Sequence, residues 1–272
     1  MILFSNAKIN IGLLILGKRA DGFHDISTAL IPIPLNDIIE LNLADKSEEE
    51  FSMEQSGIII PGKLEDNLCY KSWNLFSKAA GEIKVKMHLH KCIPVGAGLG
   101  GGSSNAVAVL IGLNKLTGNK LSRHDIHHIA TQLGSDCTFF IENKPALAEG
   151  RGEILSNSPV SLEGFHMLLL NPGISINTAW AYKKVNPNKK REPLHTLLSK
   201  PIQTWKTTVS NDFESIVFKA YPEVASLKAE LYMAGAIFTS MSGSGSTVYG
   251  LFEEEPDLDP GLKKHLLWQG RL

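Results

Sequence analysis

Apolar and polar residues alternate along several stretches of the chain, and this period of two is typical of half-buried β-strands. The pattern occurs over residues 9–15, again from residue 23 onward, over 37–43 and over 83–89. A turn with a glycine at each end, residues 17–22, separates the first two stretches. The sequence therefore predicts strands in the N-terminal third of the chain.

Other stretches carry apolar residues at helical spacing, and polar capping residues stand at their starts. These patterns predict a helix over 66–81, a helix over 104–116 with Ser103 or Ser104 as its cap, and a helix opened by Ser122 and Asp125 and ended at Gly134. Five further segments show strand, helix or hairpin patterns. They predict strands over 135–141, 145–153 and 165–173, a helix over 222–235 and a hairpin-like pair over 236–252.

Strands and helices follow one another in the order expected of an α+β protein. With 272 residues the chain is long enough for two domains. A polar, proline-containing stretch between Leu155 and Gly164 has the composition of a linker. We therefore expect an N-terminal domain over 1–155 and a C-terminal domain over 156–272.

Charge and cysteine content exclude several classes of function. The 27 basic and 28 acidic residues give a formal net charge of -1, which argues against nucleic acid or an anionic membrane as the partner. The three cysteines lie far apart and form no C-x-x-C motif, so they indicate neither a disulfide framework nor a zinc site. No apolar run approaches the ~18 residues of a membrane span. We expect a cytoplasmic protein with a small-molecule partner.

The most informative stretch is PVGAGLGGGSSNA, residues 94–106, which lies between a predicted strand and a predicted helix. Its glycines lack a Cβ, so the backbone there can adopt positive φ and lie directly against a ligand. Backbone N–H groups at the start of a helix, together with the helix dipole, favour an anion. The loop is therefore predicted to hold phosphate.

Two familiar phosphate motifs fit this loop poorly. A P-loop of the form G-x-x-x-x-G-K-[ST] needs a lysine immediately before the hydroxyl residue, whereas here glycine leads directly to Ser103. Gly96, Gly98 and Gly101 spell G-x-G-x-x-G, but the acidic residue that a dinucleotide fold places about 20 residues later is missing. A plain flexible turn would not need so many glycines.

Three separated blocks carry a family resemblance: AKINIGL near the start, PVGAGLGGGSSNA in the middle and MSGSGSTV near the end. Further blocks, GKRADGFHDI, LGSDCTFFI, AEGRGEIL and NPGISINTAWAY, lie in the matching order. Together they resemble the GHMP kinase superfamily of small-molecule kinases. The resemblance implies a two-domain GHMP kinase architecture, with a ribosomal protein S5 domain 2-like N-terminal domain and a ferredoxin-like C-terminal domain.

The resemblance also implies ATP as cofactor, with Mg²⁺ held largely by its phosphates and by water, so that no dedicated protein ligand for the metal is expected. Asn67, Lys91 and Pro94 are candidates for the adenine by position. The residues expected to hold ATP form one run of the chain: Pro94, Gly96, Ala97, Gly98, Leu99, Gly100, Gly101, Gly102, Ser103 and Ser104.

In enzymes with this pattern a lysine and an aspartate flank the hydroxyl that attacks the γ-phosphate. These correspond here to Lys8, which orients the hydroxyl, and Asp136, which accepts its proton. The residues expected to bind substrate include aromatic groups suited to a nucleobase and backbone amides suited to phosphate. They are Asn10, Phe23, His24, Tyr182, Gly243 and Ser244.

The resemblance implies phosphorylation of the 2-hydroxyl of a cytidine diphosphate-linked methylerythritol, in the non-mevalonate route to isoprenoid precursors. Alternatives within the family are homoserine, mevalonate or a sugar as substrate. Outside it, a nicotinamide-dependent oxidoreductase and a catalytically silent ligand-binding protein remain open. A monomer or weak homodimer is expected.

Overall fold

The computed structural model describes residues 1–45 and 49–272. The chain forms two compact units, each assembled from separate segments. Strands β1 (Ile2–Lys18) and β2 (His24–Leu43) each contribute residues to both. Unit 1 consists of Met1–Ala7, Pro34–Val95 and Gly100–Lys144, and unit 2 of Lys8–Ile33, Gly96–Leu99 and Pro145–Leu272.

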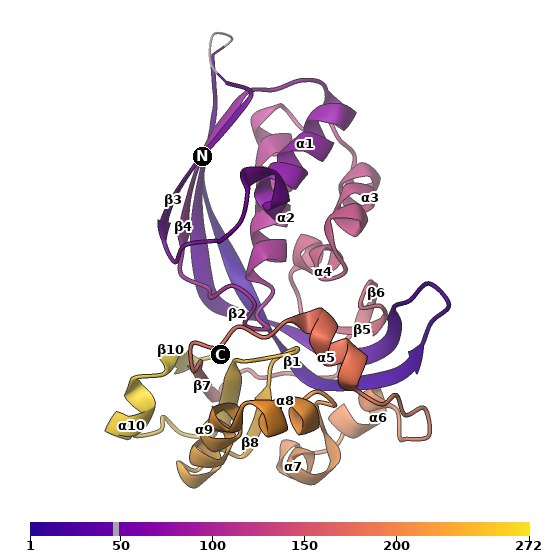
Figure 1. Ribbon diagram of the computed structural model, residues 1–272, viewed down its shortest axis with the longest axis vertical. Coiled ribbons are helices and arrows are strands. Elements are labelled where there is room, and N and C mark those ends of the chain that lie inside the picture. Colours follow the sequence, from indigo (N-terminus) through magenta and orange to yellow (C-terminus); the bar gives the residue numbers. More distant parts are fainter. Residues whose placement is uncertain (46–48) are drawn as a thin grey trace. The chain divides into compact units, whose positions relative to one another are not determined.

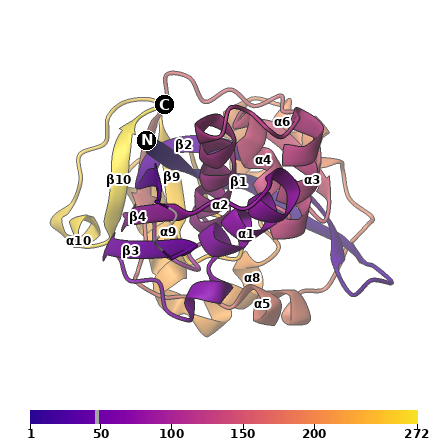
Figure 2. The same ribbon diagram turned by 90° about the horizontal axis from the view of Figure 1, so that it is seen from above.

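In unit 1, strand β4 (Val85–Lys91) pairs in parallel with β3 (Phe51–Gly57) and antiparallel with the last residues of β2. Its side chains alternate between a buried apolar face and a more exposed polar face, as the sequence pattern predicts. The helices of this unit gather on one side of the strands (Figure 1, Figure 2). They are η1 (Leu64–Asp66), α1 (Leu68–Ala80), α2 (Gly101–Leu116), α3 (Arg123–Leu133) and α4 (Cys137–Glu142).

Capping residues fix the starts of α1 and α3, as their sequence patterns predict. The Asn67 side chain accepts a hydrogen bond from the Cys69 N–H at the start of α1, and Ser122 with Asp125 forms a capping box at the start of α3. The prediction of a strand over 135–141 is wrong, because this segment forms α4. A short apolar run that is buried on all sides has no period that distinguishes the two structures.

In unit 2, the second sheet has the strand order β10-β7-β9-β8, with antiparallel neighbours. These strands are β7 (His166–Leu170), β8 (Phe238–Met241), β9 (Val248–Phe252) and β10 (Leu266–Arg271). Helix α9 (Pro222–Met233) packs on β8 and β9. The predicted buried strand at 165–173, helix at 222–235 and hairpin at 236–252 are thereby confirmed.

The remaining elements of unit 2 complete its core around the C-terminal parts of β1 and the N-terminal part of β2. Strand β5 (Ala146–Gly150) pairs with β2 and with β6 (Ile154–Asn157). The helices between β7 and α9 were not predicted. They are α5 (Thr178–Lys184), α6 (Leu194–Leu198), η2 (Ile202–Thr204), α7 (Trp205–Thr208) and α8 (Glu214–Ala220), and α10 (Pro260–Lys263) follows β9.

No helix in the described part of the chain is both long and apolar enough to cross a membrane.

Candidate functional site

The second half of the glycine loop, in unit 1, opens helix α2. Gly100 is the N-cap, with φ 68° in the left-handed region, and the helix begins at Gly101. The prediction that Ser103 or Ser104 caps this helix is wrong, because the helix starts before them and has no side-chain cap. The backbone N–H groups in the first turn of α2, at Gly101, Gly102 and Ser103, therefore have no acceptor within the helix. They can donate to a bound anion.

Packing explains the glycine at the first helical position. A Cβ on Gly101 would lie 2.9 Å from the Ile93 side chain and 3.0 Å from Lys91 Nζ. Gly102 has more room, since a Cβ there meets only Leu68 at 3.5 Å. Pro94, which directly follows Ile93, also belongs to unit 1.

The first half of the loop, Gly96–Leu99, belongs to unit 2 and lies against its backbone. A Cβ on Gly98 would fall on the carbonyl oxygen of Ser242, so only glycine fits, and φ is 79° there. The Ala97 carbonyl accepts from Thr247 N, and the Leu99 carbonyl accepts from Lys8 N at 3.0 Å. This half of the loop is thus tied to β1 and to the segment after β8.

Lys8 and Asn10 stand two residues apart on β1 and project from the same face of the strand. Lys8 Nζ donates to Asn10 Oδ1 at 2.6 Å and to the Gly98 carbonyl at 3.1 Å. Asn10 Nδ2 in turn donates to Thr28 Oγ1 at 3.0 Å, and that hydroxyl donates to the Gly12 carbonyl. Asn10 thus orients the ammonium group of Lys8, a role that the sequence did not reveal.

The turn after β8 carries Gly243 and Ser244 and completes this part of unit 2. Ser242 Oγ donates to the Gly98 carbonyl at 2.8 Å and accepts from Asn10 N at 3.1 Å. Gly243 has φ 55°, and a Cβ there would lie 3.2 Å from Gly98 Cα. Ser244 Oγ is hydrogen-bonded to Thr178 Oγ1 at 2.9 Å. Unit 2 therefore brings together the N-terminal block, half of the glycine loop and the C-terminal block.

The structure places two of the three predicted nucleobase-binding side chains together. The rings of His24 and Tyr182 are stacked, with centroids 5.0 Å apart and an interplanar angle of 25°. Burial lowers the pKa of His24, and the nearby charge of Lys18 lowers it further, so the imidazole stays neutral at pH 7. The Phe23 ring is 52 % exposed and carries the Arg151 guanidinium 4.8 Å above its centroid.

Asp136 belongs to unit 1 and Lys8 to unit 2. Asp136 is the N-cap residue of α4, but its side chain makes no capping hydrogen bond. Next to it, Cys137 is buried, and its pKa is raised to about 12 by that burial. The Cys137 thiol therefore stays protonated at neutral pH.

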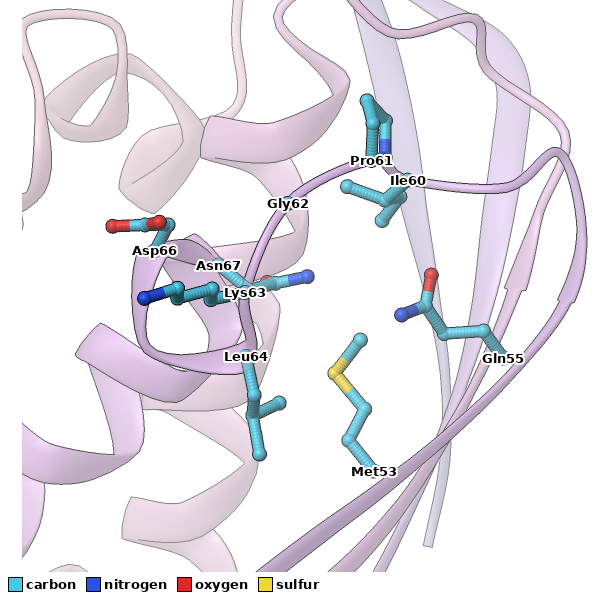
Figure 3. Close-up of a pocket in the computed structure, with 9 residues that line it drawn as sticks. All are labelled: Met53, Gln55, Ile60, Pro61, Gly62, Lys63, Leu64, Asp66 and Asn67. Carbon is cyan, nitrogen blue, oxygen red and sulfur yellow. The ribbon is translucent and has the colours of Figure 1, made fainter.

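A cavity of about 220 Å³ lies in unit 1 between β3 and the start of α1. Figure 3 shows the Met53 and Leu64 side chains along one part of it, with the Gln55 amide and Lys63 nearby. Asn67, an adenine candidate from the sequence, also lines it. The other lining residues were not predicted, because their segment contains no recognised motif.

Lys91, another adenine candidate, is engaged in a buried network. Its ammonium group pairs with Asp37, which is fully buried and also accepts hydrogen bonds from the Cys92 and Ile93 N–H groups and from Asn105 Nδ2. Burial lowers the pKa of Lys91, and the Asp37 charge opposes that shift. The network joins β2, the end of β4 and α2, just before and after the glycine loop.

Within residues 1–45 and 49–272, no group of three or more His, Cys, Asp or Glu side chains is arranged to hold a metal ion. The cysteines at 69, 92 and 137 are unpaired thiols.

Comparison with known proteins agrees with this geometry. The model of the GHMP kinases N terminal domain matches residues 67–143, and that of the GHMP kinases C terminal domain matches 195–263. These matches contain the whole glycine loop, Asp136 and the turn at 243–244. The chain belongs to the GHMP kinase family.

Curated relatives of this GHMP kinase are similar over its whole length. A 4-diphosphocytidyl-2-C-methyl-D-erythritol kinase of Bacteroides thetaiotaomicron is 42% identical and covers 100% of both chains. One of Cytophaga hutchinsonii is 45% identical over 94% of each chain.

Solved structures agree with the sequence relatives. A crystal structure of 4-(cytidine 5'-diphospho)-2C-methyl-D-erythritol kinase has a TM-score of 0.78 at 29% identity, covering 94% of this chain and 91% of the other. The homoserine kinase of Cytophaga hutchinsonii, at 19% identity and a TM-score of 0.63, shares the fold. The predicted α+β fold class and two-domain GHMP kinase architecture are confirmed.

Proposed function

We propose that the protein is a kinase that transfers the γ-phosphoryl group of ATP to the 2-hydroxyl of 4-diphosphocytidyl-2-C-methyl-D-erythritol, in the non-mevalonate route to isoprenoid precursors. The observation that carries the proposal is identity of 42% to 45%, over nearly the whole chain, with relatives of that name. The stacked pair of His24 and Tyr182 supports a substrate that contains a nucleobase. Homoserine or mevalonate would have no use for such a surface.

In this proposal the uncapped start of α2 and the left-handed glycines hold the phosphates of ATP. Bound Mg²⁺ would neutralise charge on the β- and γ-phosphates, with phosphate and water as its main ligands. Lys8, already oriented by Asn10, would orient the hydroxyl and offset developing charge. Asp136 would accept the hydroxyl proton.

Adenine would occupy the cavity beside Asn67, where Met53 and Leu64 supply apolar surface for a flat ring. The polar edge of the ring would hydrogen-bond the Gln55 amide, which lines the same cavity (Figure 3). The cytidine would use His24, Tyr182 and Phe23. We further propose a cytoplasmic enzyme, monomeric or weakly dimeric, whose partners are small molecules rather than nucleic acid or membrane.

The decisive experiment measures ADP release with ATP, Mg²⁺ and the cytidine diphosphate-linked substrate. The wild type should turn over this substrate, whereas homoserine and mevalonate should give only the background rate. Asp136→Ala should lose turnover by about 100-fold or more while still binding ATP, because it removes the proton acceptor. Asp257→Ala, at an exposed position, is the matched control and should behave as wild type. Turnover of homoserine or mevalonate alone would overturn the proposal.

A further inference from the structure

The segment Asn211–Glu214, which runs from the connection after α7 to the first residue of α8 and carries no recognised motif, holds the turn at Gly243 and Ser244 in place. We infer that Asn211 is a positioning residue for that turn. The inference rests on the proposed function, in which the turn faces the substrate.

Asn211 is buried, 3 % exposed, and its amide is completely used. Nδ2 donates to the Met241 carbonyl at 2.7 Å and to the Gly243 carbonyl at 2.8 Å. Oδ1 accepts from Phe213 N at 3.0 Å. The same amide group binds the carbonyls of Met241 and Gly243, which lie on either side of Ser242. A rotation of the turn about Ser242 would therefore break a buried hydrogen bond.

The backbone on either side of Asn211 is fixed to β1. Leu13 N donates to the Ser210 carbonyl, and Asp212 N donates to the Leu13 carbonyl, both at 2.9 Å. Leu13 lies on the same strand as Lys8 and Asn10. Asn211 therefore sets the position of the turn relative to the strand that carries the candidate catalytic lysine.

A second contact holds the start of the same turn. Glu214 Oε1 accepts from Met241 N at 2.9 Å and from Ser240 Oγ at 3.1 Å, while Lys228 pairs with its other oxygen at 2.7 Å. The backbone entering the turn is thus fixed by Glu214, and the turn itself by Asn211. Among the described residues, the hydrogen bond to the Gly243 carbonyl comes from the Asn211 amide, which therefore helps to fix the orientation of that peptide.

The test is Asn211→Asp, which keeps the volume and the hydrogen bond from Phe213 N but replaces the donating NH₂ by an oxygen facing two carbonyls. Asn114→Asp is the matched control, because Asn114 is also buried and, within the described residues, its side chain hydrogen-bonds the backbone of Leu121, at the far end of α2 from the glycine loop. Both variants lose one buried amide donor, so both lose stability.

We expect kcat of Asn211→Asp to fall about 100-fold with the KM for ATP within about threefold of wild type, since a small misplacement of the turn removes an interaction made in the transition state. Asn114→Asp should keep kcat within about threefold below its unfolding temperature. Hydrogen exchange of the backbone over residues 241–248 should accelerate in Asn211→Asp only, and this readout needs no substrate.

A kcat of folded Asn211→Asp within threefold of that of Asn114→Asp would overturn the inference, and so would unchanged exchange over 241–248. A wild-type protein that does not turn over the substrate would instead refute the proposed function, and exchange would still decide the role of Asn211.

Discussion

The buried pair of Lys91 and Asp37 offers the sharpest test of how unit 1 is held together. The change Asp37→Asn keeps the volume of the side chain but replaces one carboxylate oxygen by an NH₂ group. That oxygen accepts from Lys91 and from Asn105, so donors would then face donors. Lys91, which is 2 % exposed, would keep its charge without a counterion.

Removing one partner of a buried ion pair costs about 3 to 5 kcal/mol, and a buried donor left without an acceptor costs about 1 to 3 kcal/mol more. We therefore expect Asp37→Asn to lower the free energy of unfolding by about 5 kcal/mol. At roughly 2 to 4 °C per kcal/mol for a chain of this size, the melting temperature should fall by about 10 to 20 °C.

Differential scanning calorimetry measures this directly, with Asp257→Asn as an exposed control that should shift the melting temperature by less than about 2 °C. Lys91→Met added to Asp37→Asn should recover part of the loss, because no unpaired charge remains, with a coupling of at least about 2 kcal/mol. A shift below about 3 °C for Asp37→Asn, or full additivity of the two changes, would refute the reasoning.

Three further predictions concern other parts of the chain. Gly98→Ala should abolish turnover, because the new methyl group would collide with the Ser242 carbonyl and φ is positive at Gly98. Steady-state kinetics on protein shown by circular dichroism to be folded would test this, and retained activity would contradict it. The pKa of Asp125 lies below its usual 3.8, because the Ser122 hydroxyl and backbone N–H donate to it, so its contribution to stability is complete above pH 3.8 and is lost as pH falls through the folded-state value. The difference between the melting temperatures of wild type and Asp125→Asn should therefore be full at pH 6 and shrink as pH falls below 3.8, and a difference that grew on acidification would show that the sign is wrong. Burial raises the pKa of Cys69 to about 12, so a thiol reagent at pH 8 should leave it unmodified until urea unfolds the protein, as mass spectrometry can test.

Much of the fold could be predicted from local patterns. The strand alternation over 83–89 and the capping box at Ser122 are both signals contained within a few residues, and both are confirmed. The sequence predicts the start of α2 too late. Three glycines form the cap and the beginning of this helix, and glycine has a low helix propensity. Segment 135–141 forms α4 instead of the predicted strand. Its residues 137–140 are buried in succession, so no period distinguishes a helix from a strand there.

Residues of the candidate site could be predicted from the sequence only where they lie in a motif. Lys8, Asn10, Gly98 and the turn at 243–244 come from blocks with a family resemblance, and unit 2 brings them together. Asn211 gave no such signal, since an asparagine between two short helices is ordinarily a turn or capping residue. Its importance depends on carbonyl groups some thirty residues later in the chain, which no local pattern encodes.

The interleaving of the two units along the chain also bears on the order in which they can form during synthesis. Unit 1 ends at Lys144, so all of its segments have been made before most of unit 2 exists. Strands β1 and β2 pair with each other, but their further partners in unit 2 follow much later in the chain, β5 for Ile26–Leu30 and Asn211 for Leu13. Until those partners exist, the other edges of the two strands stay open and their apolar side chains lack the rest of the core of unit 2. A ribosome stalled between these points would therefore hold a folded unit 1 together with an aggregation-prone pair of strands.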